Sequence, residues 1–121
     1  MIKALVIDDI RVSVDVLCQL LSLLDIEAIP AYGSRAALTY LIDHIPDVVF
    51  VDLNMPGLGG YEVMGYLRRE PRLEHVPIFV VTSDDQAETA EKAKSAGALD
   101  VIVKPASYET IEESLKKAGL I

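Results

Sequence analysis

Three carboxylates and one lysine in this sequence lie just after short apolar runs, and together they could act on a phosphoryl group. The carboxylates are Asp8, Asp9 and Asp52, and the lysine is Lys104, which precedes Pro105. If the apolar runs are neighbouring parallel strands, these groups converge at one edge of a sheet. Clustered carboxylates repel one another unless a cation lies among them. A divalent metal ion and a lysine would supply that charge, and both stabilise the oxyanions of a phosphoryl group in transfer.

Four apolar runs are nearly continuous rather than alternating, which is typical of strands that are buried on both faces of a parallel sheet. They lie at residues 3–7, 48–51, 78–81 and 99–103. A fifth, weaker strand is expected at Glu27–Ala31. Pro30 lies within it and cannot donate a ladder hydrogen bond, so this strand belongs at the sheet edge.

Helical periodicity fills the gaps between these runs. The expected helices span residues 11–24, 34–44, 60–69, 86–96 and 107–118. Ser34 is a good N-terminal cap, the last helix begins at Ser107, and Gly97 is a good C-terminal cap. The pattern predicts (βα)5 and, with right-handed crossovers, a doubly wound α/β fold of the flavodoxin-like three-layer type. With an edge strand second in the chain, the strand order is 2-1-3-4-5.

Sheets of this kind bind ligands at the carboxyl ends of their strands, where the strand order reverses. That point lies between the first and third strands, with Asp8 and Asp9 on one side and Asp52 on the other. Taken singly, each residue has a simpler interpretation: an Asp could cap the following helix, and Lys104 could be a surface lysine. Thr82 ends the fourth strand, where its hydroxyl would either face the same cleft or cap the next helix.

The composition excludes several classes of function. A net charge of −8 argues against nucleic-acid binding, because phosphates would be repelled. No apolar run approaches 18 residues, so we expect no membrane segment and a cytoplasmic protein. The lone cysteine, Cys18, excludes an internal disulfide, and His44 and His75 lie outside the strand-end positions, so zinc is disfavoured. The oxygen donors suit Mg²⁺, with Mn²⁺ as an alternative.

The chain resembles the receiver domain of two-component response regulators, as in the chemotaxis response regulator, over essentially all 121 residues. This implies a single receiver domain spanning 1–121. The resemblance is carried by four motifs: Val6-Ile7-Asp8-Asp9, Val51-Asp52-Leu53-Asn54-Met55-Pro56-Gly57, Val81-Thr82-Ser83 and Val103-Lys104-Pro105.

The resemblance implies that Asp52 accepts the phosphoryl group and that Thr82 and Lys104 bind it. It also implies a Mg²⁺ site, with Asp9 as the preferred direct ligand. The implied metal ligands are Asp8, Asp9, Asp52 and the backbone carbonyl of Asn54.

The implied function is a phosphoacceptor switch of a phosphorelay that alters partner binding. The phosphoryl donor would be a sensor histidine kinase or a histidine phosphotransfer protein, and the output would pass to an effector protein or domain or to a phosphorylation-linked dimer. The domain would not be an enzyme beyond its own phosphorylation and dephosphorylation. Asn54 argues against an aspartate-nucleophile phosphohydrolase, which would have a second acid at this position, and two aspartates would repel a flavin phosphate.

Two positions depart from the family pattern and keep a second function open. Val101 and Ala106 stand where many members have aromatic residues, and the first of those aromatics takes part in signal output. The alternative is therefore a constitutive interaction or dimerisation module with weak coupling to phosphorylation.

The first helix carries a second apolar stripe beside its core-facing residues. The stripe consists of Val12, Val16, Leu20 and Leu23. It would either pack against the last helix or form a docking surface for the partner that carries the phosphohistidine.

Overall fold

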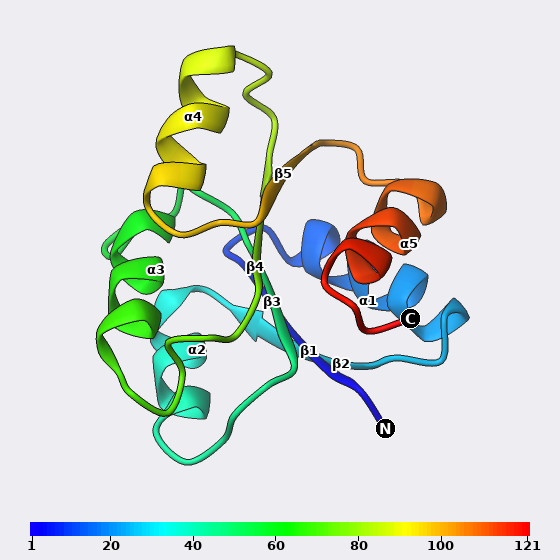
Figure 1. Cartoon of the computed structure of the whole chain (residues 1–121), viewed down its shortest axis with the longest axis horizontal. Helices are drawn as coiled ribbons and strands as arrows, with labels where there is room; N and C mark the ends of the chain where they lie inside the picture. The colour runs from blue at the N-terminus through cyan, green and yellow to red at the C-terminus, as the bar shows by residue number, and fades with distance from the viewer.

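The computed structural model describes all residues from 1 to 121, with five strands alternating with five helices (Figure 1). The strands are β1 (Lys3–Asp8), β2 (Glu27–Tyr32), β3 (Val48–Val51), β4 (Ile78–Thr82) and β5 (Asp100–Val103). The helices are α1 (Arg11–Leu23), α2 (Ser34–Leu41), α3 (Gly60–Arg69), α4 (Ala87–Ser95) and α5 (Tyr108–Lys117). None of these helices is long and apolar enough to cross a membrane.

All five strands are parallel and form one sheet in the order β2-β1-β3-β4-β5, as the sequence predicts. Strand β2 lies at the edge, where Pro30 is paired in register with Val6 of β1. An edge strand has one unpaired side, so a proline that lacks a donor is tolerated there. The predicted doubly wound α/β fold is confirmed.

Helices α1 and α5 cover one face of the sheet, and α2, α3 and α4 cover the other (Figure 1). Neighbouring strand residues point to opposite faces, and each face has its own core. Leu5 of β1 and Val49 of β3 are buried in the core under α2 and α3, whereas Val6 and Phe50 are buried in the core under α1 and α5. Both faces are thus filled, which explains why the strands read as continuous apolar runs.

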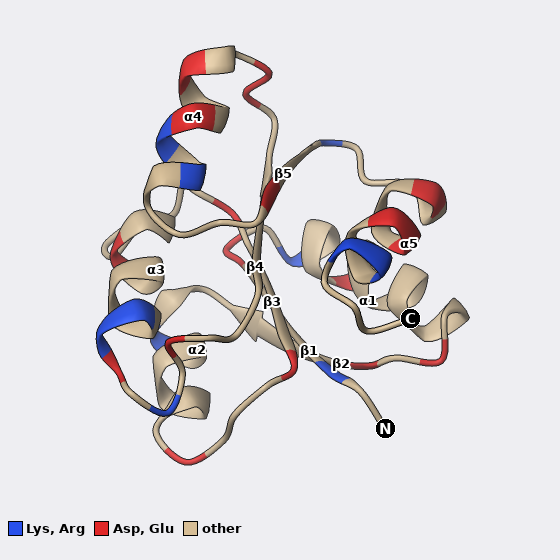
Figure 2. Cartoon of the chain, viewed as in Figure 1, with Lys and Arg blue, Asp and Glu red and all other residues tan.

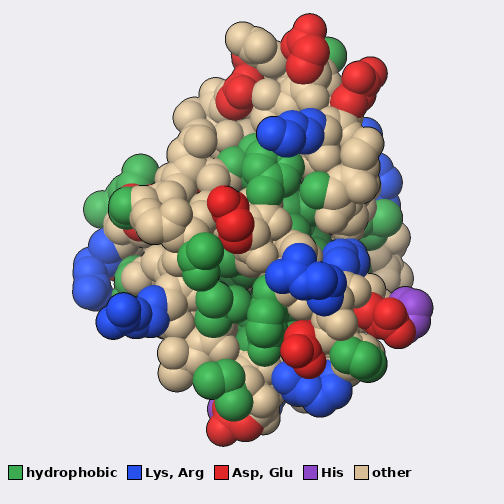
Figure 3. Space-filling view, turned by 90° about the vertical axis from the view of Figure 1, so that its left-hand side faces the viewer, with side chains coloured by type: hydrophobic (Ala, Val, Ile, Leu, Met, Phe, Trp, Pro, Cys, Tyr) green, Lys and Arg blue, Asp and Glu red, His purple; other side chains and the backbone are tan.

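The surface carries the acidic excess of the composition. Asp and Glu residues lie along α4, α5 and the loops (Figure 2). On the face formed by α2, α3 and α4, hydrophobic side chains gather between patches of Lys and Arg (Figure 3).

The start of α2 differs from the sequence prediction. Gly33, with φ of 108°, is the N-cap, and Ser34 is instead the first helical residue and makes no capping hydrogen bond through its side chain. Glycine adopts this backbone conformation without a steric penalty. The prediction that Ser34 caps α2 is therefore wrong.

Helix α2 also ends at Leu41, three residues before the expected end at residue 44. The His44 ring lies on the Tyr40 ring with centroids 4.4 Å apart, and its Nδ1 is 3.1 Å from the Tyr40 carbonyl oxygen. In a continued helix that carbonyl would accept from the backbone N–H of His44. The His44 side chain thus lies beside the carbonyl that would have accepted this backbone bond, and its Nδ1 is also 2.8 Å from Asp43 Oδ1.

The predicted start of the last helix at Ser107 and the predicted end of the fourth helix at Gly97 agree with the structure to within one residue. Ser107 caps α5 through a reciprocal pair of hydrogen bonds with Thr110. Gly97 follows the last residue of the α4 cap with φ of 114° and ends the helix.

Candidate functional site

The backbone ladder brings three charged side chains to the same edge of the sheet. Asp8 is the last residue of β1, Asp52 directly follows β3, and Lys104 directly follows β5. The Asp52 N–H donates to the Ile7 carbonyl (3.0 Å), and the Lys104 N–H donates to the Thr82 carbonyl (2.7 Å). Each residue after a strand end is thus fixed by a hydrogen bond to the neighbouring strand, and its side chain starts from a defined position.

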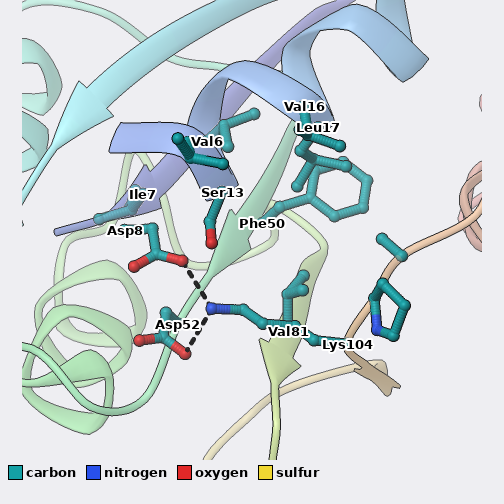
Figure 4. A pocket seen from close by; sticks show the side chains of 13 residues that line it. Val6, Ile7, Asp8, Ser13, Val16, Leu17, Phe50, Asp52, Val81 and Lys104 are labelled. Carbon is teal, nitrogen blue, oxygen red and sulfur yellow. Dashed lines mark hydrogen bonds and ion pairs between the residues drawn. The ribbon is translucent and has the colours of Figure 1, made fainter. Parts of the chain in front are cut away.

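The ammonium group of Lys104 lies between the two carboxylates (Figure 4). Its Nζ is 2.8 Å from Asp8 Oδ2 and 3.6 Å from Asp52 Oδ1. The two aspartates are only 4% and 5% exposed, so water screens their charges weakly. One lysine therefore compensates two buried acids that come from different strands.

The cluster carries more negative than positive charge. Burial, and then the charge of Asp8, raise the pKa of Asp52, and the nearby Lys104 offsets only part of this increase. For Lys104, burial alone would lower the pKa, but the hydrogen bond to Asp8 and the charges of both aspartates outweigh it, so the pKa is raised. Both shifts have the same origin, an excess of negative charge in a buried place, and such a place attracts another cation.

The donor set fits a hard divalent ion. Carboxylate oxygens of Asp8, Asp9 and Asp52 all lie within 4.8 Å of one another, and Asp9 is exposed, so its side chain is open to solvent. Mg²⁺ prefers a few carboxylates together with water. Neither Asp8 nor Asp9 is the N-cap of α1, which is Ile10, although one carboxylate oxygen of Asp8 accepts from the Ile10 N–H (3.0 Å).

Thr82 and Asn54 line a separate hollow of about 250 Å³, which neither Asp52 nor Lys104 lines. The Thr82 hydroxyl oxygen accepts a hydrogen bond from the backbone N–H of Asp84 (3.2 Å), and Asp84 in turn accepts from the hydroxyl of Thr89 in α4 (2.6 Å). Thr82 therefore does not line the pocket that contains Lys104, and its role in binding a phosphoryl group stays a prediction.

The apolar stripe of α1 does not pack as a unit. Leu20 packs against the core that α1 and α5 share. Val12 and Leu23 are each 70% exposed, and Val16 is also exposed. Packing against α5 thus accounts for one of the four residues and leaves three on the surface.

Sequence reasoning missed a pocket of about 420 Å³ that opens beside Asp52. It lies between α1 and the loop from β5 to α5, and Asp8, Asp52 and Lys104 line its polar end. The sequence offered two signals, the valines of the second apolar stripe on α1 and the small residue Ala106. Neither predicts a cavity unless the fold that brings them together is known.

Comparison with known proteins identifies one family. Residues 4–116 match the family model described as response regulator receiver domain. The chain is 32% identical to the virulence sensor protein BvgS of Bordetella pertussis over 97% of its length, and 30% identical to the response regulator PleD of Caulobacter vibrioides over 85%. It spans only 10% of BvgS and 23% of PleD.

The fold is also shared with solved structures. The chemotaxis response regulator CheY4 of Vibrio cholerae superposes with a TM-score of 0.90 at 28% identity, over 98% of both chains. A putative response regulator from Chloroflexus aurantiacus gives the same TM-score at 23% identity, a likeness of fold alone.

Proposed function

Because the chain belongs to the response regulator receiver domain family, we propose that it is a signalling switch in which Asp52 accepts a phosphoryl group from a phosphohistidine. The observation that carries this proposal is the position of Lys104, whose ammonium group lies between Asp8 and Asp52. A lysine beside a buried carboxylate places a fixed positive charge where the phosphoryl oxygens would come to lie.

The transfer step follows from this arrangement. An oxygen of the Asp52 carboxylate forms a bond to phosphorus while the bond from phosphorus to the histidine nitrogen breaks, and the electron pair leaves with the imidazole. Lys104 donates to the phosphoryl oxygens and offsets the charge that Asp52 gains. The product is a mixed anhydride, which water hydrolyses, so the signal is self-limiting.

We assign the metal site to Asp8, Asp9 and Asp52, together with the backbone carbonyl of Asn54. The grouping of the three carboxylates supports this assignment. When bound, Mg²⁺ or Mn²⁺ would supply positive charge to the carboxylates and to the phosphoryl oxygens. Thr82 would bind the phosphoryl group after transfer by donating its hydroxyl proton, which stays free while the hydroxyl oxygen accepts from the N–H of Asp84.

The proposed phosphoryl donor is a sensor histidine kinase or a histidine phosphotransfer protein in the cytoplasm, and the phosphorylated form acts on an effector or on a second copy of the domain. The exposed apolar residues of α1 support a docking surface for the donor, because they leave apolar area open to solvent on one helix. Leu23→Lys should slow transfer from the protein donor but not from acetyl phosphate. Equal slowing of both would contradict this surface.

The function is tested by incubating the protein with Mg²⁺ and acetyl phosphate and measuring its mass. We expect the mass to rise by one phosphoryl group in the unsubstituted protein and not in Asp52→Asn. Asp100→Asn is the matched control, because Asp100 also pairs with a lysine but lies at the opposite end of β5. A protein that gains no mass, or an Asp52→Asn variant that does, would overturn the proposal. Phosphorylation that leaves partner binding unchanged would instead favour a constitutive interaction module.

A further inference from the structure

The pocket beside the reaction centre has two chemically different ends. Its apolar wall is formed by Val12 and Val16 of α1, Phe50 of β3, and the pair Pro105 and Ala106 that follows Lys104. Figure 4 shows Val16 and Leu17 projecting from α1 toward the ring of Phe50. The volume of about 420 Å³ lies within the range of roughly 300–1,000 Å³ that is usual for small-ligand sites. A small organic group therefore has room in it.

The other end is the reaction centre itself. Asp8 and Asp52 line it and are more than nine-tenths buried, with the Lys104 ammonium group between them. A molecule that reaches both ends would place a phosphoryl group at Lys104 and an apolar body against the valines. With a divalent cation offsetting the carboxylates, the charge of the phosphoryl oxygens is complementary to the lysine, and the apolar body gains by leaving water.

Ala106 sets how much space the apolar end offers. It lies two residues after Lys104, is partly buried against the core that α1 and α5 share, and contributes only a methyl group to the wall. A large side chain at this position would occupy the space that the pocket now contains. The pocket therefore depends on one small residue that can be changed without touching Asp52 or Lys104.

We propose that this pocket makes Asp52 selective for small phosphodonors with an apolar leaving group, above all aromatic acyl phosphates. This inference rests on the proposed function, because it names the donor class for the same phosphoacceptor. In the reaction, a carboxylate oxygen of Asp52 forms a bond to phosphorus and the bond between phosphorus and the acyl oxygen breaks. The electron pair leaves with the aromatic carboxylate, so no further reactant is needed.

The test compares two acyl phosphates, benzoyl phosphate and acetyl phosphate, as donors in the presence of Mg²⁺. The initial rate of phosphorylation is measured by mass, and the benzoyl-to-acetyl ratio of rates is compared among variants, because this comparison cancels the intrinsic reactivity of the donors. We expect Ala106→Phe to lower the ratio roughly tenfold. A hydrophobic pocket distinguishes two substrates that differ by one methylene by about that factor or more.

Two further variants keep the test decisive. Val12 is 70% exposed at the rim of the pocket, so Val12→Phe is expected to fold, and it should lower the ratio as well. Ala36 is exposed on α2, on the opposite face of the sheet, so Ala36→Phe is the matched control and should leave the ratio unchanged.

Each outcome decides the inference. A ratio that falls in Ala106→Phe and Val12→Phe but not in Ala36→Phe supports the pocket. If Ala106→Phe does not fold, Val12→Phe decides alone. An equal ratio in all folded variants overturns the inference but leaves Asp52 as the phosphoacceptor. Absence of phosphorylation by either donor in the unsubstituted protein would overturn the proposed function as well, so the two failures are distinguishable.

Discussion

The two ends of β5 carry lysine–carboxylate pairs of nearly equal length in different surroundings. Lys104 is 2.8 Å from Asp8 at the carboxyl end, and Lys117 is 2.7 Å from Asp100 at the amino end. The first pair lies in a buried cluster with two acids for one lysine, because Asp52 is also close. The second lies near the surface with two lysines for one acid, because Lys94 is 3.7 Å from Asp100.

The pKa values move in opposite directions at the two ends. Burial raises the pKa of Asp52, and Lys104 compensates only in part. Burial alone would also raise the pKa of Asp100, but hydrogen bonds from Lys117 and from the Val101 backbone N–H outweigh it, so the pKa is lowered. The length of a lysine–carboxylate contact therefore does not by itself determine the direction of the pKa shift. The ratio of charges and the access of water determine whether a pair leaves unbalanced charge that can bind another cation.

The largest expected difference between the two ends lies in phosphoryl transfer. Lys104→Met should slow phosphorylation of Asp52 by acetyl phosphate about 100-fold, since loss of one group that stabilises a developing oxyanion costs about this much. Lys117→Met should leave the rate unchanged. Initial rates in saturating Mg²⁺ measure both effects, and similar rates in the two variants would remove the functional distinction.

The next effect concerns the free energy of unfolding. Lys104→Met leaves Asp8 and Asp52 uncompensated in a buried place and should destabilise the fold by about 2 kcal/mol, less than the ~3–5 kcal/mol of fully buried pairs because water reaches the lysine. Urea unfolding at pH 7 without metal measures this loss. Added Mg²⁺ should restore part of it, because an ion that binds only the folded protein stabilises it. A variant as stable as the parent would show that water already screens both acids.

The affinity for Mg²⁺ should depend on the exposed carboxylate of Asp9. Asp9→Asn removes an exposed carboxylate from the three-acid cluster and should weaken Mg²⁺ binding about tenfold, in line with the sensitivity of metal sites to nearby ligating groups. Asp85→Asn is the matched control, because Asp85 is an exposed acid in the loop after β4 that lies outside the cluster. Isothermal titration calorimetry of both variants measures the affinity. Equal affinities would mean that the exposed Asp9 takes no part in binding.

Much of this site could be predicted from the sequence because strand ends in a doubly wound sheet have predictable neighbours. Asp8 and Asp52 follow buried runs, and the confirmed strand order brings them together. Lys104 follows the same rule, although 96 residues separate it from Asp8. Residue type and topology are sufficient here, since backbone pairing alone fixes where each side chain starts.

Features that depend on side-chain choice could not be predicted in this way. Ser34 is a good cap by type, but Gly33 takes the position because the chain needs a positive φ there. The hydroxyl of Thr82 has two candidate partners, and only the three-dimensional structure shows it accepting from Asp84. The pocket at Ala106 depends on what fills the space between two elements, which no local pattern reports.

Ionisation of Asp52 and ionisation of Asp100 should change the free energy of unfolding in opposite directions. The folded pKa of Asp52 lies above its ordinary value of 3.8, so ionised Asp52 destabilises the fold, and Asp52→Asn should be more stable at pH 7 without metal. This gap should close as pH falls through the raised pKa. The folded pKa of Asp100 lies below 3.8, so ionised Asp100 stabilises the fold, and its contribution should be lost only as pH falls through that lower value. Urea unfolding of both Asn variants and of the unsubstituted protein from pH 7 to pH 3 measures the two differences in the free energy of unfolding. Differences of the same sign would contradict the opposite pKa shifts of Asp52 and Asp100.

The smallest expected effect is the loss of the outer pair. Lys117→Met should lower the free energy of unfolding by only about 0.5 kcal/mol, because both side chains are in contact with water and Lys94 remains near Asp100. High salt should remove even this difference, since it screens exposed charges, whereas the larger loss in Lys104→Met should persist because buried charges are screened less. Urea unfolding of both variants at low and high salt separates the two ends. A salt-independent loss in Lys117→Met would mean that the lysine stabilises the fold through its aliphatic chain, and the contrast between the ends would then rest on packing rather than on charge.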